Sequence, residues 1–289
     1  RSTLFPYTTL FRSRTGSNGI GSVGTSESYH WLAEYFTTYS KNIKNVHRFT
    51  ALGGITFENT FFRSVGAGAR QFPNDDLTTN FLQSGAISTF TVNSFATESK
   101  TSSFLGRINY TYSDKYLLTT TMRADGTSRF SEAHKYALFP SVAVGWRLIN
   151  EKFLHLPSFV NDLKVRFSYG ELGNQAIDNY QTLQTFGSSG TAILNDRAVT
   201  GVEPLRLANS DLRWETTSEY NYGLDFGLFG NRITGSIEYY TKKTGDQLFR
   251  KPVPASTGFT QQLVNFGSVV NKGWRSEEHT SELQSQNRI

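Results

Sequence analysis

Residues 19–24, Gly-Ile-Gly-Ser-Val-Gly, have the glycine spacing of a dinucleotide-binding loop. Such a loop holds a pyrophosphate only where a strand leads into it and an amphipathic helix follows it. The residues before Gly19 predict no strand, and those after Gly24 predict no amphipathic helix. The sequence therefore does not predict a dinucleotide site.

Other residues that could perform catalysis or hold a metal are few and scattered. The 289-residue chain has no Cys, which excludes a disulfide framework, a thiolate metal site and a Cys nucleophile. Its five His are His30, His47, His134, His155 and His279, far apart in sequence. No Walker A, HExxH or GxSxG motif occurs. We expect no enzyme activity, no metal site and no cofactor.

Charged and amide side chains instead alternate with apolar ones at period two, as in strands with one polar and one apolar face. Arg107 and Asn109 alternate with Ile108 and Tyr110. We expect Arg123 and Asp125 to pair at a strand end and order the loop that follows. The candidate polar-face residues are Arg107, Asn109, Arg123, Asp125, Lys164, Arg166, Asp225, Glu238 and Lys242.

This alternation predicts about nine strands. The clearest cover 104–112, 115–125, 163–170, 220–228 and 233–242; weaker ones cover 31–39, 48–57, 138–147 and 264–274.

The predicted connections differ in length. Short turns are expected at 40–45, 113–115 and 230–231, and long polar stretches at 58–100, 125–137, 174–216 and 244–263, with a short helix over 76–86. Short turns on one rim, long loops on the other and strands near ten residues are typical of an outer-membrane barrel.

Aromatic side chains near strand ends fit the interfacial girdles of such a barrel. These are Tyr112, Tyr116, Trp146, Tyr220, Tyr222 and Tyr239. Alternation alone equally fits a secreted, soluble β-sandwich that binds glycans, in which the apolar face meets a second sheet. The connection lengths, strand lengths and aromatic positions favour the barrel.

Two further classes are disfavoured by composition. No stretch approaches the roughly 18 apolar residues of a membrane helix. The net charge of +5 is modest, basic residues do not cluster, and the aromatics alternate with the charges on opposite strand faces. Nucleic-acid binding would favour both on one face, so it is not predicted.

The two ends of the chain differ from the rest. Residues 1–13, RSTLFPYTTLFRS, and 275–289, RSEEHTSELQSQNRI, resemble translated DNA-sequencing adapters. We interpret both as non-native segments. Residues 14–274 are then expected to be an internal piece of a longer protein.

Several long motifs, in order, resemble the SusC/RagA family of TonB-linked outer-membrane proteins. They include LKVRFSYGELGNQ at 163–175, RITGSIEYYTKKTGDQLF at 232–249 and NFGSVVNKGW at 265–274. The ranges 103–149, 150–154, 212–229 and 252–259 complete the series.

The resemblance implies a partial antiparallel transmembrane β-barrel over 14–274, less than half of a plugged barrel of about 22 strands. It implies a nutrient importer of the outer membrane that is energised by the TonB complex and works with a SusD-like surface lipoprotein. The implied solute is an oligosaccharide, with an oligopeptide second. A siderophore or vitamin receptor is the alternative within the same barrel class.

Overall fold

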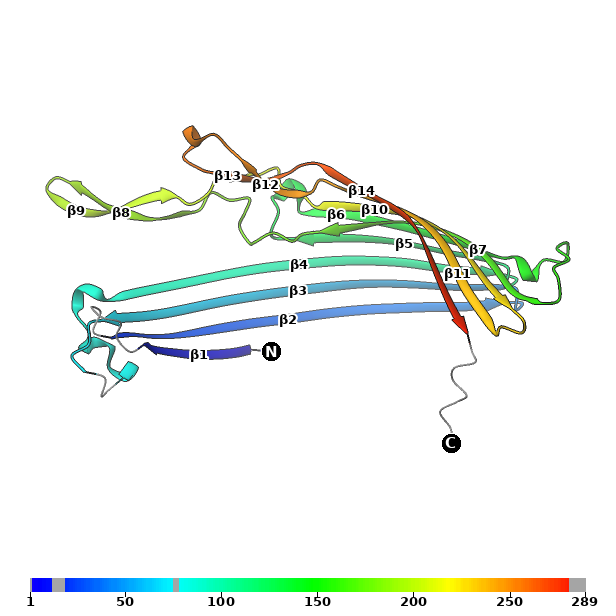
Figure 1. Ribbon diagram of the computed structural model, residues 1–289, viewed down its shortest axis with the longest axis horizontal. Helices are drawn as coiled ribbons and strands as arrows, with labels where there is room; N and C mark the ends of the chain where they lie inside the picture. The colour runs from blue at the N-terminus through cyan, green and yellow to red at the C-terminus, as the bar shows by residue number, and fades with distance from the viewer. Residues whose placement is uncertain (1, 12–18, 75–77, 281–289) are drawn as a thin grey trace. The chain divides into compact units, whose positions relative to one another are not determined.

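The chain folds into antiparallel β-structure in a computed structural model, which describes residues 2–11, 19–74 and 78–280 (Figure 1). Ten strands form one sheet in which sheet order follows chain order. They are β1 (Ser2–Phe11), β2 (Ile20–Ile43), β3 (His47–Arg70), β4 (Thr91–Tyr112), β5 (Tyr116–Thr127), β6 (Tyr136–Arg147), β7 (Val160–Asn174), β10 (Glu215–Leu228), β11 (Ile233–Gly245) and β14 (Ser268–Thr280).

Tight turns join successive strands at one end of the second of two compact units, which comprises residues 34–56 and 102–289. Lys44 and Asn45 between β2 and β3, and Ser113 and Asp114 between β4 and β5, all have positive φ, between 50° and 56°. Paired positive φ values match the right-handed twist of the flanking strands. Between β10 and β11, φ is 69° at Gly230 and 61° at Asn231. The short turns predicted at 113–115 and 230–231 are confirmed, and the one predicted at 40–45 is present but begins later, because β2 continues to Ile43.

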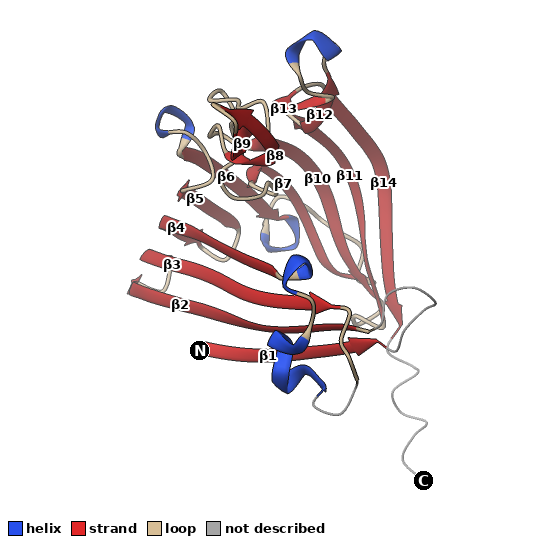
Figure 2. Ribbon diagram, turned by 90° about the vertical axis from the view of Figure 1, so that its left-hand side faces the viewer, coloured by secondary structure: helices blue, strands red, loops and turns tan. Residues whose placement is uncertain are grey.

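The opposite connections of this unit are long and contain small elements of their own. Figure 2 shows that its helices are short and lie in connections. These elements are η3 (Glu132–His134), the β8–β9 hairpin (Phe186–Leu194 and Arg197–Pro204), and β12 (Leu248–Pro252), η5 (Ala255–Thr257) and β13 (Gln261–Asn265). On the short-turn side, η4 (Leu148–Asn150) opens the connection from β6 to β7.

A small hydrophobic core holds the long connections together. Its buried members are Phe130, Phe139, Ile177, Leu212 and Trp214, which come from three separate stretches of the chain. Leu212 has no exposed surface, and Trp214 Nε1 donates to the Lys135 carbonyl at 3.3 Å. These long loops are therefore ordered by packing against each other.

The first unit comprises residues 1–33 and 57–101. In it β1 pairs with the start of β2, and η1 (Thr78–Ser84) and η2 (Ile87–Thr89) lie between β3 and β4. Phe72 and Leu82 pack so closely over Gly21 that a β-carbon there would lie 3.1 and 3.2 Å from them. In place of the helix predicted over 76–86, residues 78–84 form the 3-10 segment η1, which is kinked at Phe81; residues 76–77 lie outside the described part.

Two predictions are wrong here. Three strands are much longer than ten residues, and β3 and β4 cover most of the range 58–100 that was predicted as a long polar stretch. β2 and β3 have 24 residues each and β4 has 22. At roughly 3.3 Å per residue these strands far exceed an apolar band about 25 Å tall. The predicted alternation covers only part of each of these strands, and the backbone pairing continues beyond it.

The strand count agrees with the expectation once β1 is set apart, because nine other strands belong to the main sheet. β1 and the last residues of β14 fall in the adapter-like segments. Their origin stays a prediction. Among the described residues, no helix is long and apolar enough to cross a membrane.

Candidate functional site: the two faces of the sheet

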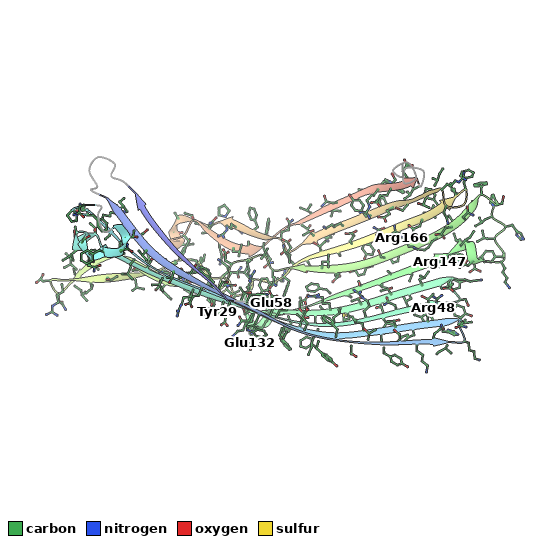
Figure 3. All side chains as sticks on the ribbon, turned by 90° about the horizontal axis from the view of Figure 1, so that it is seen from below. Tyr29, Arg48, Glu58, Glu132, Arg147 and Arg166 are labelled. Carbon is green, nitrogen blue, oxygen red and sulfur yellow. The ribbon has the colours of Figure 1, made fainter. Side chains whose placement is uncertain are left out.

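The strand register collects the apolar side chains of the second unit on one face, here called the apolar face. Leu118 pairs with Val144, and Val144 with Phe167. Phe167 continues the row to Tyr222, which pairs with Tyr239. One row of apolar side chains thus crosses five strands without interruption, and side chains stand off both faces of the sheet (Figure 3).

No second layer covers this face in the part of the chain that the structure describes. Ile108, Leu118 and Ile237 are 40%, 36% and 43% exposed, and Phe167 and Leu224 are only half-buried. In a β-sandwich these side chains would fill the space between two sheets. The sandwich alternative therefore does not fit the structure.

The six predicted interfacial aromatics divide into two groups. Tyr112, Tyr116 and Trp146 lie at the short-turn end, with successive ring centroids 6.2 Å apart. Tyr222 lies six residues before the end of β10 and contacts Phe167 at 5.0 Å. The ring of Tyr220 lies tilted against that of Tyr169, and the ring of Tyr239 against that of Trp274, with centroids 4.7 and 5.0 Å apart.

Four aromatics of β2 were missed by the sequence reasoning. Tyr29, Trp31, Tyr35 and Tyr39 are each about half exposed or more. Trp31, Tyr35 and Tyr39 lie at odd-numbered positions of the strand predicted over 31–39, whose period-two signal could have identified them, whereas Tyr29 lies before that range.

Glu151, also not predicted, organises the short-turn end. Its carboxylate accepts hydrogen bonds from Lys115 Nζ at 2.7 Å, Tyr116 Oη at 2.8 Å and Trp146 Nε1 at 3.0 Å. These donors, the Lys115 ammonium first, lower the pKa of Glu151 to about 2. Tyr116 and Trp146 are thereby fixed to the connection between β6 and β7.

Charged residues of β7, β10, β11 and β14 form one network on the opposite, polar face. Asp225 accepts from Lys164 Nζ at 2.7 Å and from Arg166 Nε at 3.0 Å. Arg166, labelled in Figure 3, also pairs with the buried Glu238, as does Arg275 of the adapter-like segment. Four predicted polar-face residues are brought together here.

The other predicted polar-face residues pair locally. Arg123 Nε binds Asp125 at 2.7 Å, as expected. Arg107 Nε donates to Thr121 Oγ1 at 3.2 Å, and Asn109 Oδ1 accepts from Thr119 Oγ1 at 2.9 Å.

Arg107, Arg123 and Asp125 line an open hollow of about 640 Å³ on the polar face. Lys242, opposite Glu219 in the register, belongs to neither this hollow nor the charge network.

A broad antiparallel sheet with an exposed apolar face and a charge-paired polar face defines a membrane-spanning β-barrel wall. A family model described as "TonB dependent receptor-like, beta-barrel" matches residues 3–275. The chain belongs to this family, and it is part of an outer-membrane β-barrel protein. The family consists of receptors and transporters, not of enzymes.

Relatives and solved structures agree with this assignment. "TonB-dependent receptor P3" of Formosa agariphila is 38% identical over 271 residues, which are 93% of this chain and 27% of that protein. "TonB-dependent receptor SusC" of Bacteroides thetaiotaomicron is 38% identical over 184 residues, 62% of this chain and 18% of that protein. The chain thus spans about a quarter or less of these relatives.

The chain is also similar to a component of the solved "Structure of the RagAB peptide transporter". The TM-score is 0.80 at 28% identity, over 90% of this chain and 28% of that one.

Proposed function

We propose that the protein containing this chain imports a nutrient across the outer membrane with energy from the TonB complex, and that this chain forms part of the barrel wall. The register carries the proposal, because it keeps aliphatic and aromatic side chains on one face across β5, β6, β7, β10 and β11. An Arg or Lys facing mid-bilayer lipid costs about 2–4 kcal/mol. The charged face is therefore turned towards a watery lumen.

In this proposal the nine polar-face residues line the lumen, and the six predicted aromatics lie at the lipid interface. The contacts favour a hydrated wall over a solute site, since Arg166 and Lys164 are engaged by Asp225 and Glu238. Charges neutralised in this way let a solute pass without binding it tightly.

For the solute we propose an oligosaccharide, as the resemblance to the SusC/RagA family implies, and a SusD-like surface lipoprotein as the partner. An oligopeptide is the second candidate. It is supported by the similarity of this chain to components of the RagAB peptide transporter and the RagAB peptide importer.

Uptake by the full-length protein in its own outer membrane tests this function. Cells with and without the gene are given labelled oligosaccharides or labelled oligopeptides, and each uptake is repeated after the proton gradient is collapsed. Gradient-dependent uptake of oligosaccharide that requires the gene is the expected result. Uptake of peptide alone would contradict the oligosaccharide and support the oligopeptide as the solute. Uptake of neither would contradict both proposed solutes.

A gel assay tests the barrel itself. The full-length protein should migrate differently on SDS gels before and after boiling, because a closed barrel resists SDS. Equal mobility would contradict the membrane-barrel assignment.

A further inference from the structure

The open hollow of about 640 Å³ on the polar face, here called the polar-face hollow, is lined by residues of five strands, β4, β5, β6, β7 and β10. Arg107 Nε of β4 donates to Thr121 Oγ1 of β5 at 3.2 Å. From there the register runs from Thr121 to Ser141, on to Gly170 and on to Glu219. A cation and an anion therefore end one row of residues whose middle members are small.

The charges at the two ends of this row are not neutralised, unlike those of the charge network. Among the described residues, the terminal nitrogens of Arg107 and the carboxylate of Glu219 have no hydrogen-bond or ion-pair partner. Lys242 is opposite Glu219 in the register but forms no ion pair with it. Arg123, also in the lining, is paired with Asp125. The hollow thus offers a cation at one wall and an anion at the other to charged groups of a solute.

The floor between the two charges is open and polar. Gly170 lies in the middle of the row, and a β-carbon there would meet only Ser141 Cβ, at an ordinary contact distance of 3.5 Å. The surrounding packing does not require a glycine, whose effect is to leave the floor uncovered. The hydroxyls of Ser141 and Ser168 line the hollow and have no hydrogen-bond partner in the part of the chain that the structure describes. They can both donate to and accept from a bound solute.

We propose that the polar-face hollow is a binding site for a short oligopeptide with free ends, whose carboxylate binds Arg107 and whose ammonium group binds Glu219. This inference rests on the proposed import function and concerns its second solute, the oligopeptide. Arg107 and Glu219 are four strand spacings apart, about 19 Å between their Cα atoms. An extended tripeptide spans about 10 Å, and the two long side chains cover the rest. A neutral oligosaccharide would use the serine hydroxyls but has no charge for either end.

Isothermal titration calorimetry of the full-length protein in mild detergent tests the proposal. The probe is trialanine with free ends, compared with N-acetylated trialanine, trialanine amide, dialanine and the neutral trisaccharide maltotriose. Each blocked end should weaken binding about tenfold, because one charge-assisted hydrogen bond is lost. Dialanine is too short to reach both charges and should also bind about tenfold more weakly than trialanine. Equal binding of the free and the blocked peptides, or tighter binding of maltotriose, would overturn the site.

Variants of the two walls assign the ends of the peptide. Glu219→Gln should weaken the binding of free trialanine about tenfold but leave that of N-acetylated trialanine unchanged, since the acetylated end carries no charge. Arg107→Gln should do the same for trialanine amide. The matched controls, Glu203→Gln and Arg197→Gln, each remove an exposed charge of β9 and should alter neither. Equal effects of wall and control variants would contradict the proposed contacts.

The shape of the floor is tested separately. Gly170→Leu covers the floor between the two charges and should weaken the binding of free trialanine about tenfold, because the solute loses its contacts there. Each variant is checked for the heat shift on SDS gels. If a variant loses this shift, the blocked peptides still decide the proposal, because they require only the unchanged protein.

The uptake assay distinguishes the two levels of failure. Cells that take up neither solute through the gene contradict the proposed function. Uptake of either solute, together with peptide binding that does not depend on the end groups, contradicts only the polar-face hollow.

Discussion

The guanidinium of Arg166 lies over Gly223 of the neighbouring strand, where a β-carbon would stand 2.7 Å from Nε and 2.8 Å from Cζ. The two residues are directly opposite in the register of β7 and β10. The absence of a side chain at Gly223 lets Arg166 reach Asp225 on one side and Glu238 on the other. A glycine thus allows the charge network of the polar face to assemble.

Gly223→Ala should therefore destabilise the barrel. The added methyl group displaces Arg166 and leaves Glu238 and Asp225 with fewer donors, which we expect to cost about 1.5–3 kcal/mol. Urea unfolding of the full-length protein in vesicles measures the loss. Gly106→Ala is the matched control, since a β-carbon there meets nothing within 4 Å. Equal stability of the two variants would show that Arg166 adapts without loss.

Glu151 predicts a pH-dependent contribution to stability. Its pKa is about 2 in the folded protein against an ordinary value of 4.5. A lowered pKa stabilises the fold above the ordinary value, and this stabilisation is lost as the pH falls from there through the folded pKa. Glu151→Gln should lower the urea midpoint at pH 7, and the difference from the unchanged protein should shrink below about pH 4.5.

The control for this experiment is Glu132→Gln, an exposed carboxyl in η3. It should leave the midpoint within error at each pH. A Glu151→Gln difference that stayed constant down to pH 3 would contradict the ionic account of this cluster.

The small hydrophobic core of the long connections predicts that one residue orders several of these connections at once. Leu212→Ala should cost about 2–5 kcal/mol, since it opens a cavity in a fully buried position. We expect faster amide exchange in 128–135 and 175–214 together, with the strands unaffected. Leu205→Ala, a change at a position 58% exposed, is the control. Exchange that rises only next to residue 212 would argue against a shared core.

An added charge on the apolar face tests whether that face meets lipid. Leu224→Arg should destabilise the inserted barrel by about 2–4 kcal/mol. Ser168→Arg places the same charge on the polar face beside the hollow and should cost much less. Urea unfolding in vesicles measures the stability of both variants. A greater loss for Ser168→Arg than for Leu224→Arg would contradict the proposal that the polar face lines the lumen.

The isolated residues 14–274 should not insert into membranes. Nine strands leave two unpaired edges, and each unpaired backbone group costs several kcal/mol in hydrocarbon. We expect aggregation or an unfolded chain when the piece is mixed with liposomes, and no protease-protected band. Efficient insertion of the piece by itself would disprove this expectation.

Local sequence was sufficient to predict much of the structure of the barrel wall. Alternation placed Ile108 and Arg107 on opposite faces, and Gly230 and Asn231 predicted a turn with positive φ because these residue types tolerate it. The pairing of Arg123 with Asp125 also followed from their positions two residues apart on one strand, where side chains share a face.

Interactions between distant residues came only from the tertiary structure. The contacts of Arg166 with Glu238, and the packing of Phe130 on Trp214 at 5.4 Å, depend on strand register and loop packing. Glu151 has no local signal, because its three donors come from the end of β6, the start of β5 and the turn before it.

The chain by itself determined which side chains alternate, where it turns tightly and which family it resembles, because those properties depend on neighbours within a few residues. Tertiary structure decided how far β2, β3 and β4 extend and which charges neutralise each other. Backbone hydrogen bonds continue where side-chain alternation has ended, and ion pairs form across a register that no single strand encodes.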